Sequence, residues 1–173
     1  EDIRFTPKRH PSRITVTAGL SGTGEVMALD VDTILDAGAY TGLSPVVLQR
    51  AIFAAAGVYN FPNVRVRGRA VLTNNVPTGC FRGFGAPQAF FAVEMFMNRL
   101  ARRLGLRPDQ IRRRYMAKQG DRTLTGGVFH DPVKLEEMLD LALEKSGFVS
   151  RWAAAEARRG GPPGPSRPAA GGE

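Results

Sequence analysis

The chain has 173 residues, of which 43% are hydrophobic and 23% are charged. This composition is typical of one globular domain with its own core. The longest apolar stretch, residues 46–59, is interrupted by Gln49 and Arg50 and is too short to cross a bilayer, so we expect no membrane span. The single cysteine, Cys80, excludes an internal disulfide and is compatible with a cytoplasmic protein.

The net charge of +8 allows three kinds of partner, namely nucleic acid, a phosphorylated ligand or an acidic protein surface. We rank nucleic acid lowest, because the arginines are dispersed and no aromatic residues interleave them as in RNA-binding motifs, and we favour a solvated or interdomain face as the explanation of most of the charge. The chain begins without methionine and without the apolar core of a signal peptide. We therefore expect it to be part of a longer polypeptide.

The first elements have the pattern of a β-hairpin. Apolar residues alternate along 13–20 and again along 27–35, and the turn Ser-Gly-Thr-Gly at 21–24 separates the two runs. Asp30 and Asp32 fall on the opposite face, where a solvated strand surface is favoured over a metal-binding pair. Residues 46–56 predict a short buried helix, and residues 64–72 predict another strand.

Three helices are predicted further along the chain. The first begins at Pro87 and carries a core-facing stripe of Phe90, Val93, Met97, Leu100 and Leu104. The second covers 108–118. The third covers 131–145, with Asp131 as its cap and Gly147 as its terminator; its apolar face consists of Leu135, Met138, Leu139 and Ala142.

The order of strands and helices is mixed, which predicts the α+β class. We expect one domain over residues 1–148, followed by a tail rich in Gly, Pro, Ala and Arg over 149–173. Nine of the fourteen residues from Gly160 to Glu173 are Gly or Pro. Such a segment buries little apolar surface, so we expect disorder from about residue 160.

The most informative stretch is the glycine-punctuated loop Thr78–Gln88, called here the fingerprint loop. Glycines let backbone amides approach a ligand closely, and the start of the following helix favours negative charge. The loop therefore suits an anionic or dithiolene-bearing cofactor. By its spacing alone it also fits a simple turn before a core helix.

The sequence Phe-Arg-Gly-Phe-Gly-Ala-Pro-Gln at 81–88 resembles the signature of the xanthine dehydrogenase and aldehyde oxidase family. Residues 35–40, 44–47, 62–70 and 118–121 also resemble segments of that family, in the family's order, so that the resemblance covers about residues 8–148. It implies part of the first molybdopterin-binding domain of the large subunit of a molybdenum hydroxylase. The implied cofactor is molybdenum-molybdopterin.

The resemblance also assigns site residues. It places the cofactor contact at Phe81, Arg82 and Gly83, through the backbone amide of Arg82. It makes Phe84 one of the aromatic rings that hold a flat heterocyclic substrate. Arg50 lies 32 residues before Arg82, the separation of the family's substrate-binding arginine in purine-hydroxylating members, where a guanidinium stabilises developing negative charge. Without the resemblance, Arg50 would fit an ion-pair or snorkelling residue.

The implied reaction is hydroxylation of a purine or related N-heterocycle with oxygen from water. The catalytic base glutamate is expected in a C-terminal part outside this sequence. Iron-sulfur clusters and FAD are expected in partner domains or subunits. The isolated chain should therefore be inactive. Three alternatives stay open: a noncatalytic assembly or binding remnant of that subunit, an aldehyde oxidase or carbon monoxide dehydrogenase-like subunit, and a basic nucleic-acid-binding module.

Cys80 departs from the alanine that many relatives carry at this position. Carbon monoxide dehydrogenases of the same superfamily place a copper-binding cysteine in this loop, but one residue separates it from Phe-Arg, whereas Cys80 adjoins Phe81. We therefore expect a small buried residue rather than a copper ligand. His10 and His130 lack nearby metal-ligand partners in the sequence and receive no role.

Overall fold

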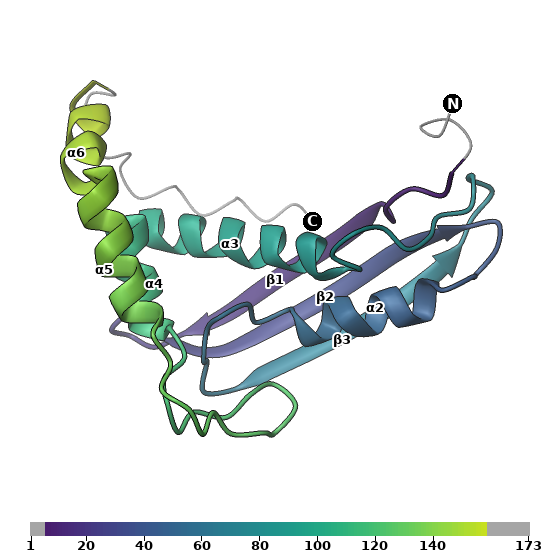
Figure 1. The fold of residues 1–173 in the computed structure, drawn as a ribbon, viewed down its shortest axis with the longest axis horizontal. Helices are drawn as coiled ribbons and strands as arrows, with labels where there is room; N and C mark the ends of the chain where they lie inside the picture. The colour runs from purple at the N-terminus through teal and green to yellow at the C-terminus, as the bar shows by residue number, and fades with distance from the viewer. Residues whose placement is uncertain (1–5, 159–173) are drawn as a thin grey trace.

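The computed structural model describes residues 6–158, which form one three-stranded sheet and five helices. Helices α2 and α3 lie along the sheet, whereas α5 and α6 lie beyond one end of it (Figure 1). This mixed arrangement confirms the predicted α+β class. The elements in chain order are β1 (Ser12–Leu20), β2 (Val26–Gly38), α2 (Ser44–Phe53), β3 (Val64–Leu72), α3 (Ala86–Arg103), α4 (Pro108–Tyr115), α5 (Leu135–Ser146) and α6 (Phe148–Arg158).

The predicted hairpin is confirmed by the antiparallel pairing of β1 with β2, in which Val16 lies opposite Val31. The turn is closed by two backbone hydrogen bonds, from Ser21 N to Glu25 O (2.8 Å) and from Gly24 N to Ser21 O (3.0 Å). Alternation of apolar and polar residues makes one face of β2 the core face, on which Leu29, Val31 and Leu35 are buried.

Strand β3 has the bounds that the sequence predicts, and it pairs with β2 in parallel. A parallel neighbour needs a crossover connection, and α2 supplies it. The crossover helix packs closely on β3, because a Cβ at Gly68 would lie 2.8 Å from both Leu48 Cδ1 and Ile52 Cδ1. The glycine thus lets α2 approach the strand.

The opposite face of the sheet carries cross-strand ion pairs. Arg65 donates to both carboxylate oxygens of Asp30 (3.1 and 2.5 Å), and Arg69 pairs with Asp32 at 3.3 Å. The hydrogen bond from Arg65 lowers the pKa of Asp30. These aspartates therefore pair with arginines of β3 on a solvated strand face, as the alternation predicts.

Helix α3 covers β1 and supplies much of the core. Val93, Met97 and Leu100 are buried, as their spacing predicts, and they pack with Leu29 of the sheet. The assignment of Phe90 to the same stripe is wrong, because Phe90 is 45% exposed. The inward-facing residue of that turn is Ala89, and one residue further along a helix turns about 100° away from the core.

The later helices differ more from the prediction. Helix α4 ends at Tyr115, three residues early, because Met116 turns into extended backbone and bridges to Tyr59. Helix α5 begins at Leu135 rather than Asp131, since the chain before it is held by hydrogen bonds from Gly120 N to Phe129 O and from Gln119 Nε2 to His130 O. Its end at Gly147, in a left-handed conformation, is confirmed.

The apolar face predicted for α5 is not a core face. No residue of α5 is buried, and Met138 is 64% exposed. Residues 148–158 form α6, a helix that the sequence did not indicate.

The disorder predicted from about residue 160 lies outside the described residues, and the division of the chain at residue 148 stays a prediction. Among residues 6–158, no helix has both the length and the apolar character needed to cross a membrane.

A polar network ties α3 to α4 and to the loop before β3. The Tyr59 hydroxyl donates to Glu94 Oε1 (2.6 Å), and Arg112 donates to Glu94 Oε2 from Nε (2.9 Å) and Nη2 (2.5 Å). Burial, with the nearby carboxylate, raises the pKa of Tyr59 above its usual range. Glu94 therefore accepts hydrogen bonds from the Tyr59 hydroxyl and from the Arg112 guanidinium, which also donates to Pro108 O and Asn98 Oδ1.

We expect Glu94→Ala to lower the free energy of unfolding by about 1–3 kcal/mol, because it leaves the buried Tyr59 hydroxyl without its acceptor and removes the carboxylate bonded to the mostly buried Arg112 guanidinium. Urea denaturation monitored by circular dichroism measures this change. The control is Glu144→Ala on the exposed surface of α5. A loss for Glu94→Ala no larger than that of the control would show that the network contributes nothing to stability.

Candidate functional site

The fingerprint loop has an unusual backbone at the start of α3. Three consecutive residues have positive φ, namely Gly83 (89°), Phe84 (52°) and Gly85 (95°), and Phe84 is the only non-glycine residue within 6–158 with this property. A non-glycine residue in this region costs about 1–3 kcal/mol and is concentrated at functional sites. Hydrogen bonds from Phe84 N to Phe81 O (2.8 Å) and from Ala86 N to Gly83 O (3.0 Å) hold the conformation.

Gly83 and Gly85 are also required by close packing. A Cβ at Gly83 would lie 2.4 Å from Pro87 Cγ, and a Cβ at Gly85 would lie 2.3 Å from Val47 O. The second contact joins the fingerprint loop to the backbone of α2. The loop is therefore fixed against a helix and does not vary freely in solvent.

The residues predicted to hold the cofactor present free backbone donors. Phe81, Arg82 and Gly83 are all exposed, and within residues 6–158 neither Arg82 N nor Gly83 N donates to another protein group. Two adjacent amides without partners, on a rigid loop at the positive end of an 18-residue helix, suit an anionic ligand. The geometry fits the molybdopterin cofactor that the sequence predicts.

The two predicted substrate residues lie on neighbouring segments. Arg50 is in α2, and the residue after it, Ala51, has its N atom 3.1 Å from the position of a Cβ on Gly85, which follows Phe84. Arg50 is exposed, and no hydrogen bond or ion pair engages its guanidinium within the described part of the chain. Residues 6–158 thus provide no ion-pair partner for Arg50, and its role stays a prediction.

Cys80 is exposed, so the expectation of a small buried residue is wrong. The cysteine precedes the tight turn of the loop, where the chain lies on the surface. Among the residues that the structure describes, no three His, Cys, Asp or Glu side chains cluster as a metal site would require.

The structure adds three contacts that the sequence did not indicate. Arg9 Nη2 donates to Arg82 O (2.7 Å), Gln88 Nε2 donates to His10 O (3.3 Å), and the buried His10 ring bonds to Ser44 Oγ through Nε2 (2.7 Å). These contacts join segments up to 78 positions apart. No local periodicity or spacing signals them, so only the folded chain could show them.

His10 has a consequence for the pH dependence of stability. Its ring is 2% exposed, and Nδ1 has no hydrogen-bond partner in the described structure. Burial lowers the pKa of His10 below its usual 6.5, and the charge of Asp36 opposes this only in part. The folded chain therefore takes up a proton at lower pH than the unfolded chain does.

We expect stability to be full above pH 6.5 and to fall as the pH drops below that value, by at most about 1.4 kcal/mol per pH unit, because the unfolded state then binds the extra proton. Thermal unfolding between pH 7.5 and 5.5 measures the effect. His10→Gln should flatten the profile, whereas His130→Gln, at an exposed position, should leave it unchanged. A profile unaltered by His10→Gln would assign the dependence to other groups.

Comparisons with known proteins show the family to which the chain is similar. The family model described as molybdopterin cofactor-binding domain matches residues 1–116. The chain is 43% identical over 121 residues to a probable subunit of xanthine dehydrogenase from Bacillus subtilis (strain 168), covering 70% of this chain and 16% of that protein. It is 40% identical over 146 residues to the nicotinate dehydrogenase large molybdopterin subunit of Eubacterium barkeri, covering 84% and 34%.

A solved structure shows the same fold. The aldehyde oxidoreductase from Desulfovibrio gigas superposes with a TM-score of 0.73 at 34% sequence identity, covering 90% of this chain and 16% of that one. The chain thus spans between about a sixth and a third of the length of these three proteins. The match to the family model, over residues 1–116, includes the sheet, α2, the fingerprint loop and α3. This chain belongs to the molybdopterin cofactor-binding domain family of the xanthine dehydrogenase and aldehyde oxidase type.

Proposed function

We propose that this chain forms one wall of the cofactor and substrate site of a molybdenum hydroxylase that acts on a purine or related N-heterocycle with oxygen from water. One observation carries the proposal. The fingerprint loop presents two amides that donate to no group within residues 6–158, Arg82 N and Gly83 N. It packs against the helix that bears Arg50, whose guanidinium has no partner in the same described range. Donors for an anionic cofactor and a cation for the substrate thus belong to one packed unit.

Each residue of this wall has a distinct part in binding. The amides of Arg82 and Gly83 donate to the cofactor, and the Phe81 ring lies beside them in the loop. Phe84 offers a flat apolar face that orients a planar heterocycle, and orientation lowers the entropic part of the barrier. When bound, the molybdenum cofactor supplies the redox chemistry that amino-acid side chains lack.

Arg50 supports the choice of an N-heterocycle over an aldehyde. A purine carbonyl gains negative charge as the ring is attacked, and a guanidinium that is always charged stabilises that oxygen. Relatives named for xanthine and for nicotinate act on N-heterocycles by those names, whereas the Desulfovibrio relative is named for aldehydes. An aldehyde substrate is therefore the second candidate.

The proposal also includes partners. The site residues named here bind and orient, and none of them is a general base. We therefore propose that the isolated chain is inactive, and that the rest of the large subunit supplies the base glutamate. Iron-sulfur and FAD domains or subunits carry the electrons away, and a cytoplasmic location suits a chain whose single cysteine is unpaired.

A chimera tests this function. Residues 1–148 replace the matching segment of the Desulfovibrio gigas aldehyde oxidoreductase, and the product is made in cells that synthesise the cofactor. We expect about one molybdenum per chain by mass spectrometry, and dye reduction with a purine or nicotinate as electron donor. The isolated 173-residue chain is the control, for which we expect neither. A folded chimera without molybdenum would reject the cofactor site, and one that oxidises only aldehydes would reject the substrate class.

A further inference from the structure

The segment before β1 is fastened to the fingerprint loop on both sides of Arg9. Gly79 N donates to Lys8 O (3.0 Å), and Gln88 Nε2 donates to His10 O (3.3 Å). The next residue, His10, is anchored by its buried ring to Ser44 Oγ at the start of α2. The backbone of Arg9 is therefore held in place before its side chain makes any contact.

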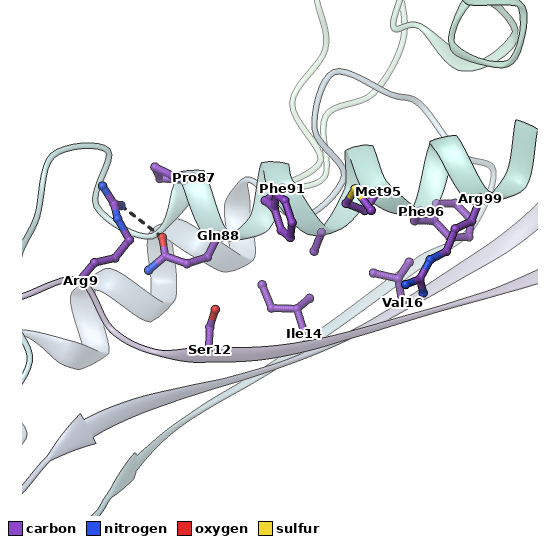
Figure 2. Close-up of a pocket in the computed structure, with 11 residues that line it drawn as sticks. Arg9, Ser12, Ile14, Val16, Pro87, Gln88, Phe91, Met95, Phe96 and Arg99 are labelled. Atoms are coloured by element: carbon purple, nitrogen blue, oxygen red, sulfur yellow. Dashed lines mark hydrogen bonds between the residues drawn. The ribbon is translucent and has the colours of Figure 1, made fainter. Parts of the chain in front are cut away.

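The Arg9 side chain reaches three groups of the fingerprint loop. Nη2 donates to Arg82 O (2.7 Å), Cζ lies 4.9 Å from the centroid of the Phe81 ring, and Nη1 donates to Gln88 Oε1 (3.4 Å). Figure 2 shows this last bond, between Arg9 and the first turn of α3 at one end of the cleft that separates β1 from α3. A planar guanidinium suits such a set of contacts, because it combines directed N–H donors with a flat face for an aromatic ring.

These contacts determine the direction in which the free amides point. Phe81 O accepts from Phe84 N, and Arg82 O accepts from Arg9. The carbonyl oxygens of the two peptide units on either side of the Arg82 Cα are thus both held by protein donors. In a trans peptide the N–H points opposite to the carbonyl of the same unit, so the N–H groups of Arg82 and Gly83 face away from Phe84 N and Arg9.

We propose that Arg9 is a positioning residue for the cofactor site, which fixes the peptide planes around Arg82 so that its amide and that of Gly83 face the cofactor. The inference rests on the proposed function, because it takes these amides as the cofactor donors. Phe84 stands in a costly left-handed conformation. The charged hydrogen bond to Arg82 O offsets part of that cost and keeps the binding conformation populated without a ligand.

The conformational part is tested on the full 173-residue chain by amide hydrogen exchange. We expect Arg9→Ala to accelerate exchange at Phe84 N and Ala86 N by about tenfold, because a charged hydrogen bond and a ring contact are lost. Amides of β2 should not change. Arg9→Lys should give a smaller acceleration, since lysine keeps the charge without the planar fork. Arg99→Ala is the matched control, because Arg99 is exposed on the same cleft and the charge change is equal.

Unchanged loop exchange in Arg9→Ala, or equal acceleration in Arg99→Ala, would overturn the inference. If Arg9→Ala fails to fold, the same criteria apply to Arg9→Lys.

The effect of Arg9 on cofactor binding is tested in the chimera, where we expect the Kd for the cofactor to rise about tenfold in Arg9→Ala as the population of the binding-competent loop falls. Loss of loop protection with unchanged molybdenum content would overturn the positioning role. A wild-type chimera without molybdenum would instead reject the proposed function, and the exchange data would still decide whether Arg9 holds the loop.

Discussion

Gly85→Ala is expected to destabilise the domain strongly. A Cβ at this position would lie 2.3 Å from Val47 O and 3.1 Å from Ala51 N, and both are backbone atoms that cannot turn aside as a side chain does. The φ of 95° adds strain for any residue with a Cβ. Together, overpacking and backbone strain should remove more than about 3 kcal/mol of stability, a large share of what a domain of this size has.

Gly126→Ala separates the two causes. Its φ of 88° is close to that of Gly85, but nothing lies within 4 Å of its added Cβ. We expect a loss of only about 1 kcal/mol, from backbone strain alone. Urea denaturation of both variants and the wild type measures the difference. Equal losses would show that α2 and α3 can move apart at little cost, and that the fingerprint loop is not fixed by this contact.

Elements with strong local patterns could be predicted from the sequence. The alternation over 64–72 predicts β3 with both its ends, and the hairpin of β1 and β2 follows from two alternating runs around a glycine-containing turn. The buried face of α3 follows from the spacing of Val93, Met97 and Leu100. In each case neighbouring residues alone set the periodicity, so no tertiary information was needed.

Features that depend on distant parts of the chain could not be predicted. The parallel pairing of β3 with β2 depends on the path of the crossover, and the exposure of Phe90 depends on the rotation of α3 over the sheet. The start of α5 depends on hydrogen bonds made by the preceding loop, which delay the helix to Leu135. Local propensity does not contain these interactions.

The site shows the same division. A family resemblance assigns Arg82, Phe84 and Arg50, and the structure places them on one loop and the helix packed against it. Their roles toward cofactor and substrate stay predictions. Arg9 was missed, because its partner Arg82 lies 73 residues away. The left-handed backbone of Phe84 was also missed, since phenylalanine rarely adopts it and only the flanking glycines hint at such a turn.

The role of Arg50 predicts a selective loss of activity. In a complete subunit that contains this chain, Arg50→Met should lower kcat/KM for a purine by about 10- to 100-fold, the equivalent of one lost charged hydrogen bond to a developing oxyanion. Turnover of a small aldehyde should change little, because a small aldehyde has no ring carbonyl on which the guanidinium of Arg50 could stabilise negative charge. Steady-state dye reduction with both substrates measures the two values.

The variant Arg50→Lys distinguishes the contribution of the positive charge from that of the planar guanidinium geometry. Lysine retains a positive charge on a flexible stem but loses the planar fork, so we expect a purine rate between those of the wild type and Arg50→Met. Arg50 is exposed and unpaired within residues 6–158, so neither substitution should shift the thermal unfolding midpoint by more than a degree or two, since surface changes away from such contacts cost roughly 0.5 kcal/mol or less. Equal losses on purine and aldehyde would instead show that Arg50 shapes the site as a whole. A fall in the unfolding midpoint that tracks the loss of rate would show that it supports α2.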